Sequence, residues 1–254
     1  WKNSGIKVVG ENRGQLELSL ARGYENIVIP LPQHIVAWNL SDTSFRELRL
    51  VYNKQHKFYM WHLVLQAEFE DPTPPGSKIA AIDMGEIHPV AITNGEDAAV
   101  ISCRRLRAQR QHTNQILASI SAKQAKCKKY SRRWWRLQRR KRRFLDKQKR
   151  RIRDLNHKIS HETVEWCTEH EVGELAIGDV RTVADGKRLG KKSQQKVSNW
   201  SHGEMRRYIT YKAARQGIKV DAKVSEKHTS QHCPNCGKRN KPRGRTYVCT
   251  DCGS

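Results

Sequence analysis

The strongest structural signal in this chain is a long stretch, from Arg104 to Val172, that contains neither glycine nor proline. Because these two residues most often end helices, the stretch predicts α-helix. A single helix of this length would extend about 100 Å at 1.5 Å per residue. We therefore expect a hairpin of two helices, with the turn at residues 128–131 and with Ser131 capping the second helix.

The second predicted helix carries two kinds of surface. Its apolar side chains recur every seven residues and predict a packing face, made of Leu145, Ile152, Ile159 and Trp166, with Leu155 between them. The opposite faces hold a basic block with few acids for intrahelical ion pairs. The block comprises Arg132, Arg133, Arg136, Arg139, Arg140, Lys141, Arg142 and Arg143.

Two aromatic residues, Trp134 and Trp135, lie inside this basic block. Arginine and lysine neutralise phosphates whatever the base sequence, and flat rings stack on exposed bases. We interpret the block as a nucleic-acid contact rather than a solvated face, and expect at least one of the two tryptophans to be buried against the apolar seam. The residues expected to contact nucleic acid are Arg132, Arg133, Trp134, Arg136, Arg139, Arg140 and Arg143.

The charge of the whole chain supports a polyanionic partner. The 49 Lys and Arg exceed the 25 Asp and Glu by 24, and so large a single-signed charge opposes compaction unless a partner neutralises it. Hydrophobic residues make up 37%, enough for a core, which excludes wholesale disorder. No membrane span or signal peptide is visible, so we expect a cytoplasmic protein without membrane contact, and we assume a monomer.

The first 70 residues predict short antiparallel strands, because apolar and polar residues alternate between Gly, Asn and Pro. The expected strands are 5–9, 16–20, 27–29, 47–52 and 58–69, which we interpret as a small β-barrel or sandwich. A proline-rich linker at 71–76 ends this domain. We therefore assign residues 1–76 to the first domain, 77–227 to the second and 228–254 to a third.

The second domain predicts an α/β fold. Strands are expected at 79–83, at 90–93 before an Asn94-Gly95 hairpin turn, at 99–103, at 174–180 and at 217–224. A basic loop over 181–198 and a helix near 203–216 connect the last two. This order resembles an RNase H-like sheet that carries the helical hairpin 104–172 as an insertion.

The third domain contains two Cys-x-x-Cys pairs, Cys233 with Cys236 and Cys249 with Cys252, twelve residues apart. Each pair precedes a glycine and places two thiolates on one tight turn. Two such turns supply the four sulfur ligands of a structural Zn²⁺ ion, which organises the fold and leaves no open position for catalysis. We interpret the nearby His228 and His232 as bystanders, and expect the basic loop 238–245 to touch phosphates.

Acidic residues at strand ends suggest a second metal site. Asp83 ends an apolar strand, where a carboxylate is costly without a cation or metal. Paired carboxylates that hold two Mg²⁺ ions cleave phosphodiesters by in-line attack of water. The candidate partners are Asp179, Glu226 and Glu86, although an Asp before Gly is also a common turn residue.

Taken together, these segments resemble TnpB, the RNA-guided nuclease of insertion sequences, and its relatives the type V CRISPR effectors. Residues 82–88 are similar to the first RuvC segment of that family, 175–181 lie where the second would be, and 229–237 match the entry to its zinc ribbon. The resemblance implies a RuvC endonuclease that uses Mg²⁺, binds a guide RNA and cuts target DNA. It also implies that residues 1–76 are the later part of a wedge domain.

The chain departs from the family pattern at Gly178, where the family has a Glu. The third family acid is expected beyond Ser254, and the N-terminal recognition region upstream of Trp1. We favour a relocated acid: Glu226 first, because its strand should lie beside that of Gly178, and then Asp179, which should face the wrong side of a regular strand. A nuclease-inactive RNA-guided repressor or targeting module stays open, as does a ribosomal zinc-ribbon protein.

Overall fold

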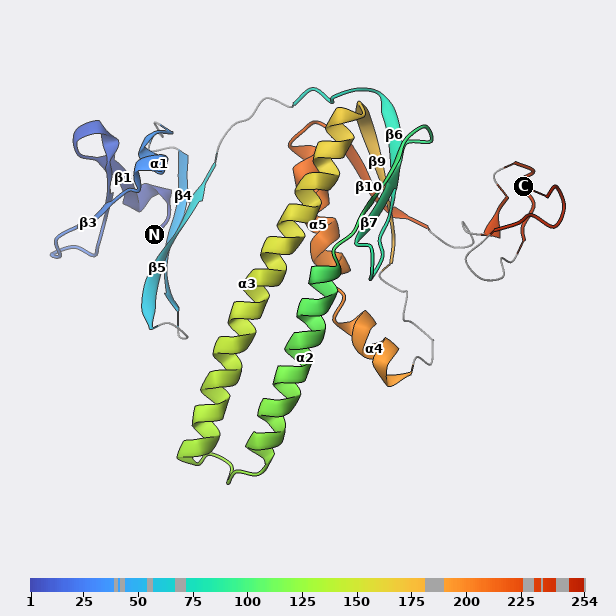
Figure 1. Cartoon of the computed structure of the whole chain (residues 1–254). Coiled ribbons are helices and arrows are strands. Elements are labelled where there is room, and N and C mark those ends of the chain that lie inside the picture. The colour runs from blue at the N-terminus through green and yellow to red at the C-terminus, as the bar shows by residue number, and fades with distance from the viewer. Residues whose placement is uncertain are drawn as a thin grey trace. The chain divides into compact units, whose positions relative to one another are not determined.

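The computed structural model describes residues 1–38, 41, 44–53, 57–66, 72–180, 190–225, 231–233, 235–240 and 247–253. Contacts divide the chain into two compact units, Trp1–Glu70 and Asp71–Ser254 (Figure 1). Within the described residues, no helix is both long enough and apolar enough to cross a membrane.

The first unit is built from two small antiparallel sheets, one of β1, β2 and β3 and the other of β4 and β5. Alternation buries Leu16 and Leu18 of the second strand against Ile6, Phe45 and Leu48. The described strands therefore form two sheets around one core, and assignment to a wedge domain stays a prediction. The elements are β1 (Ile6–Val9), β2 (Gln15–Leu18), β3 (Ile27–Pro30), α1 (Gln33–Val36), β4 (Phe45–Asn53) and β5 (Phe58–Leu65).

The second unit contains a five-stranded mixed sheet in the order β10-β9-β6-β7-β8. Its strands are β6 (Lys78–Asp83), β7 (Val90–Thr93), β8 (Ala98–Ile101), β9 (Val172–Gly178) and β10 (Lys219–Val224). β6, β7 and β8 run antiparallel, whereas β9 and β10 run parallel to β6. Because parallel neighbours need long crossovers, the helices lie between β8 and β9 and between β9 and β10.

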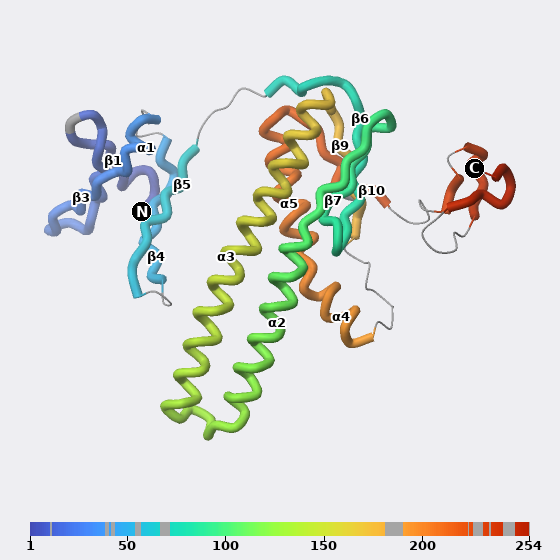
Figure 2. Tube along the Cα trace, in the orientation of Figure 1, coloured from blue at the N-terminus to red at the C-terminus, as the bar shows by residue number. Residues whose placement is uncertain are grey.

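The helical hairpin forms as expected, from α2 (Arg104–Ala125) and α3 (Arg132–Glu169) (Figure 2). Ser131 caps α3, since its hydroxyl accepts a hydrogen bond from the backbone N–H of Trp134 at 3.3 Å. Tyr130 takes a positive φ of 65°, which turns the chain just before the cap.

One face of the sheet packs against the helices. Ala80, Ile82, Leu175 and Ile177 point into a shared core with residues of α3 and of α5 (His202–Ala214). On the other face, Ile79 and Val100 are 61% and 60% exposed. Consecutive residues at the end of a strand therefore point into two different environments.

The expected apolar seam of α3 is only part of its packing surface. Ile159 is buried, and Ile152, Leu155 and Trp166 pack against the core while half-buried. The interior also holds polar side chains in mutual contact: Gln109 of α2 donates to Gln148, and Asn156 donates to Glu204 of α5 at 3.0 Å. Apolar periodicity does not detect such contacts, because they are made by hydrogen bonds between polar side chains.

The segment before β6 packs tightly against the start of β9 and against the turn that precedes β10. A Cβ on Gly173 would lie 2.2 Å from the carbonyl oxygen of Gly76. A Cβ on Gly217, whose φ is +73°, would lie 2.2 Å from the carbonyl oxygen of Pro72. Glycine is therefore required at both positions for this segment to lie against the sheet.

The loop expected over 181–198 is in part wrong. Residues 181–189 lie outside the described residues, but α4 (Lys191–Ser198) is a helix. Its lysines and glutamines are good helix formers, and the run has no glycine or proline. No residue of α4 is buried, so it lacks the apolar period by which sequence patterns reveal helices.

Candidate functional site

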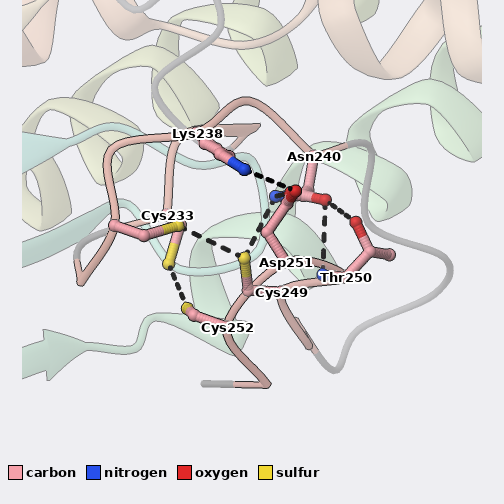
Figure 3. Close-up of polar contacts among 8 residues, drawn as sticks. Cys233, Lys238, Asn240, Cys249, Thr250, Asp251 and Cys252 are labelled. Carbon is pink, nitrogen blue, oxygen red and sulfur yellow. Dashed lines mark hydrogen bonds and ion pairs between the residues drawn. The ribbon is translucent and has the colours of Figure 1, made fainter.

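The four cysteines of the two pairs converge on one point (Figure 3). Their sulfur atoms all lie within 4.8 Å of one another, with 3.6 Å between Cys233 and Cys252 and between Cys236 and Cys249. A tetrahedron of sulfurs around Zn²⁺ has edges of about 3.8 Å, from a Zn–S bond of about 2.3 Å. The donor set and its spacing therefore fit a structural zinc ion.

Both turns have the backbone geometry that such a site needs. The N–H groups of Gly237 and Gly253 donate to the carbonyls of Cys233 and Cys249, at 2.9 and 3.0 Å. Both glycines have positive φ, 70° and 75°, which explains their place after each pair. The N–H of Cys236 lowers the pKa of the Cys233 thiol, which favours the thiolate that binds metal.

Asn240 braces the two turns, a role that the sequence analysis missed. Its amide donates to the sulfur of Cys249 at 3.1 Å, and its carbonyl accepts from the N–H of Thr250 at 3.3 Å (Figure 3). Asp251 accepts from the same amide at 3.4 Å and pairs with Lys238 at 3.0 Å. Asn240 is 7% exposed within a basic loop, and nothing in that composition distinguishes it from its neighbours.

The strand ends form a second region of interest. β6 and β9 pair in parallel up to Ile82 and Ile177, which brings Asp83 and Gly178, one residue further along each strand, beside one another. Gly178 in turn pairs with Val224 of β10. Three neighbouring strands therefore end together, with an exposed carboxylate on β6 and no side chain on β9.

The other predicted acids at this end have different surroundings. Asp179 contacts Arg206 of α5, with 3.4 Å between Oδ1 and Nη1, and so lies on the helical side as its position predicted. Glu86 pairs with Arg107 of α2 at 3.6 Å. Glu226 and His228 lie outside the described residues. Among the side chains that the structure does describe, the only group of three or more His, Cys, Asp and Glu able to share a metal is the cysteine set.

The basic block lies along the first turns of α3. The six arginines of the block that are expected to contact nucleic acid are all exposed: Arg132, Arg133, Arg136, Arg139, Arg140 and Arg143. Trp134 is half-buried and packs edge-on against Trp135, with ring centres 4.9 Å apart, and Tyr130 lies 5.4 Å from Trp134. The hairpin tip thus presents a cluster of three aromatic rings beside a row of guanidinium groups.

Comparison with known proteins relates these regions to families. Residues 52–184 match the OrfB_IS605 family, described as probable transposase, and residues 202–254 match the Cas12f1-like TNB domain. The chain is 24% identical to the TnpB-like protein MJ0751 of Methanocaldococcus jannaschii over 238 residues, which cover 89% of this chain and 83% of that protein. It is 30% identical to the CRISPR-associated endodeoxyribonuclease Cas12f1 of Sulfoacidibacillus thermotolerans over 101 residues, 39% of this chain and 22% of the relative.

A solved structure, the cryo-EM structure of a CRISPR-Cas12f ternary complex, resembles the fold. The TM-score is 0.57 at 18% identity, and the match covers 95% of this chain and 48% of that one. The chain thus spans about half the length of this structural neighbour and a smaller part of the bacterial nuclease. Because the transposase family matches just over half of the residues, the chain belongs to the OrfB_IS605 family of probable transposases, among TnpB-like and Cas12f-like proteins.

Proposed function

We propose that this protein is an RNA-guided DNA endonuclease of transposon origin. Its family membership supports this, because its relatives include a TnpB-like protein and a Cas12f1 endodeoxyribonuclease. In such systems base pairing with a guide RNA selects the target, and the protein grips the backbone. The net charge of +24 and the exposed arginines of α3 provide for that grip.

The observation that carries this proposal is the common end of β6, β9 and β10. The strand order of this sheet is consistent with an RNase H-like, RuvC-type sheet, in which carboxylates at adjacent strand ends bind divalent ions. Asp83 is the first proposed ligand of catalytic Mg²⁺. Glu226 follows two residues after Val224, the partner of Gly178, and is the proposed replacement for the acid that Gly178 lacks.

The second candidate function is RNA-guided DNA binding without cleavage. Gly178 favours it, because a glycine offers no ligand at the position between Asp83 and Val224. Binding through the α3 arginines and a structural zinc ion in the cysteine cluster do not depend on the acids. Such a protein would act as a repressor or a targeting module.

One experiment separates the two functions. RNA that copurifies with the protein is sequenced to identify the guide, and a plasmid library with the matching target and randomised flanks is incubated with the complex in Mg²⁺. We expect cleavage by the wild type and none by Asp83→Asn, with target binding kept in both. Target binding without cleavage by the wild type would instead establish the inactive alternative.

Two further variants locate the second acid. Glu226→Gln is expected to abolish cleavage, whereas Asp179→Asn is expected to keep it, because Asp179 is engaged with Arg206 on the helical side. Cleavage by Glu226→Gln would reject the relocated ligand and move the assignment to Glu86 or Asp179. Zinc content, measured for each variant, controls for folding of the cysteine cluster.

A further inference from the structure

A pocket of about 380 Å³, lined by polar and charged residues, lies between α2 and α4. One stripe of each helix lines it, at spacings of three, four and seven residues, which place side chains on one helical face. The stripe of α2 comprises Arg107, Arg110, Gln111 and Asn114. The stripe on and just after α4 comprises Lys192, Gln195, Lys196 and Asn199.

Apolar burial within α4 contributes little to holding it in this position. None of its residues is buried, and a contact with α2 is made by amides, where Asn199 donates to Asn114 at 3.4 Å. A helix whose one apolar residue is the half-buried Val197 gains little from packing against a protein surface. Two hydrophilic stripes face one another across a pocket large enough for a ligand. This arrangement indicates that a polar ligand fits between them.

The charges of the pocket require that ligand to be an anion. Arg107, Arg110, Lys192 and Lys196 face a single acid among the lining residues, Glu86, which pairs with Arg107 at 3.6 Å. The pocket therefore has an excess of three positive charges. Like charges brought together repel one another unless a counter-ion is bound.

Arg110 gives the pocket a built anchor. The residue is only 8% exposed, and its Nη2 donates to the hydroxyl of Ser201 at 2.6 Å. Its Nε is buried and has no hydrogen-bond partner within the described part of the chain. Burial lowers the pKa of Arg110, yet arginine keeps its charge, so the lining of the pocket includes a buried cation with one unsatisfied N–H.

We propose that the pocket between α2 and α4 binds one nucleotide of a single-stranded nucleic acid, with the phosphate at Arg110, Lys192 and Lys196. The carboxamides of Gln111, Asn114 and Gln195 both donate and accept hydrogen bonds, which suits the edge of an unpaired base or a sugar hydroxyl. A small inorganic anion would leave most of these amides unused. This inference rests on the proposed nucleic-acid function and assigns it a second contact, apart from the α3 arginines.

Hydrogen exchange of the complete chain tests the pocket. Octanucleotides of mixed sequence, one of DNA and one of RNA, are added separately and exchange is followed by peptide. We expect the backbone amides of 191–198 to exchange at least about tenfold more slowly with bound oligonucleotide, because a helix without buried residues opens readily when free. Protection by RNA alone would assign the pocket to the guide, and protection by DNA alone to the target strand.

The matched variants are Lys196→Gln, which removes a charge from the pocket, and Lys191→Gln, which removes one from the same helix outside it. We expect Lys196→Gln to lose the protection of 191–198. It should also reduce the slope of log binding constant against log salt concentration by about 0.7. Lys191→Gln should keep the protection. Arg110→Gln should behave like Lys196→Gln if circular dichroism shows that it folds.

Exchange in 191–198 that neither oligonucleotide slows, while α3 is protected, would overturn the inference and leave the proposed function intact. Equal loss of protection in Lys191→Gln and Lys196→Gln would also overturn it, because general charge would then explain the binding. Oligonucleotide binding with Lys196-dependent protection of α4 can also occur in a protein that never cuts DNA. That result supports the pocket, while the endonuclease proposal fails.

Discussion

The cysteine cluster and the strand ends of the mixed sheet are both metal sites predicted from sequence, and they differ in how their ligands are brought together. The cluster takes its sulfurs from two short turns, each fixed by a local hydrogen bond to a glycine. The strand ends take their acids from segments separated by the whole helical hairpin. In the first case spacing along the chain defines the site, whereas in the second the register and facing of the strands define it.

This difference is visible in Asp83 and Asp179. Each comes at or just after the end of a parallel strand, but Asp83 is exposed while Asp179 pairs with Arg206. An offset of one residue reverses the side of a sheet that a side chain faces. Similar sequence surroundings therefore lead to a carboxylate available for ions and to one held in an ion pair.

The largest predicted effect is loss of zinc from the cysteine cluster. Binding of structural zinc contributes about 10–16 kcal/mol of apparent free energy to the folding of small zinc domains. We expect one zinc per chain. In Cys249→Ser, or after chelation, we expect loss of metal and of amide protection over 231–233, 235–240 and 247–253. Elemental analysis and hydrogen exchange measure both, with Cys127→Ser as control. A chelated protein with a protected cluster would contradict the assignment.

Truncation of a side chain in the sheet core should destabilise the second unit without loss of zinc. Ile177 is fully buried at the end of β9, so Ile177→Ala is expected to lower the free energy of unfolding of the second unit by about 3 kcal/mol. The zinc content should not change, because the cysteines do not depend on this core. Val100→Ala, on the open face, should change stability by less than about 0.5 kcal/mol. Denaturant unfolding followed by circular dichroism distinguishes the two.

The contacts around the cysteines should tune the affinity for zinc. Asn240→Ala removes the amide that donates to Cys249, and partners of metal ligands typically contribute about 10- to 100-fold in affinity. Competition with a chelator measures this change. The control Asn235→Ala, whose amide is exposed and 4.0 Å from Cys252, should change affinity less. Equal effects of both variants would argue against a bracing role for Asn240.

The smallest predicted effect separates the two aspartates. Asp179→Asn is expected to cost about 1 kcal/mol of stability, because a half-buried ion pair with Arg206 is lost. Asp83→Asn should change stability by less than about 0.5 kcal/mol, because its side chain is exposed, yet should abolish cleavage. Thermal unfolding and plasmid cleavage of the same preparations test the pair. Loss of cleavage in both variants would place both acids in one site.

Local signals in the sequence predicted most of the framework. The absence of glycine and proline identified the hairpin, Ser131 its cap, and Asn94-Gly95 a turn in which the Asn94 side chain accepts from the N–H of Asp97 at 2.7 Å. These features depend on neighbouring residues alone. The residues that bring Cys233 to Cys252 are likewise close in sequence, so the cluster could be predicted as well.

Features that depend on partners distant in the chain could not be predicted in this way. The side chains of Gln148 and Asn156 are buried where Gln109 and Glu204 hydrogen-bond to them from other helices. The pocket anchor Arg110 is likewise identified only when Ser201 and α4 are placed beside it. No apolar period marks such residues, because a polar side chain looks the same in the sequence whether its helical face is buried or exposed.

The contact of Gly76 with Gly173 has a practical consequence for dissecting this protein. The proline-rich segment before β6 would normally be chosen for cleavage between domains, but its backbone touches Gly173 at the start of β9 and Gly217 in the turn before β10. A fragment that starts at Lys78 would lose the backbone that both glycines contact. A fragment that retains Pro72 keeps both contacts.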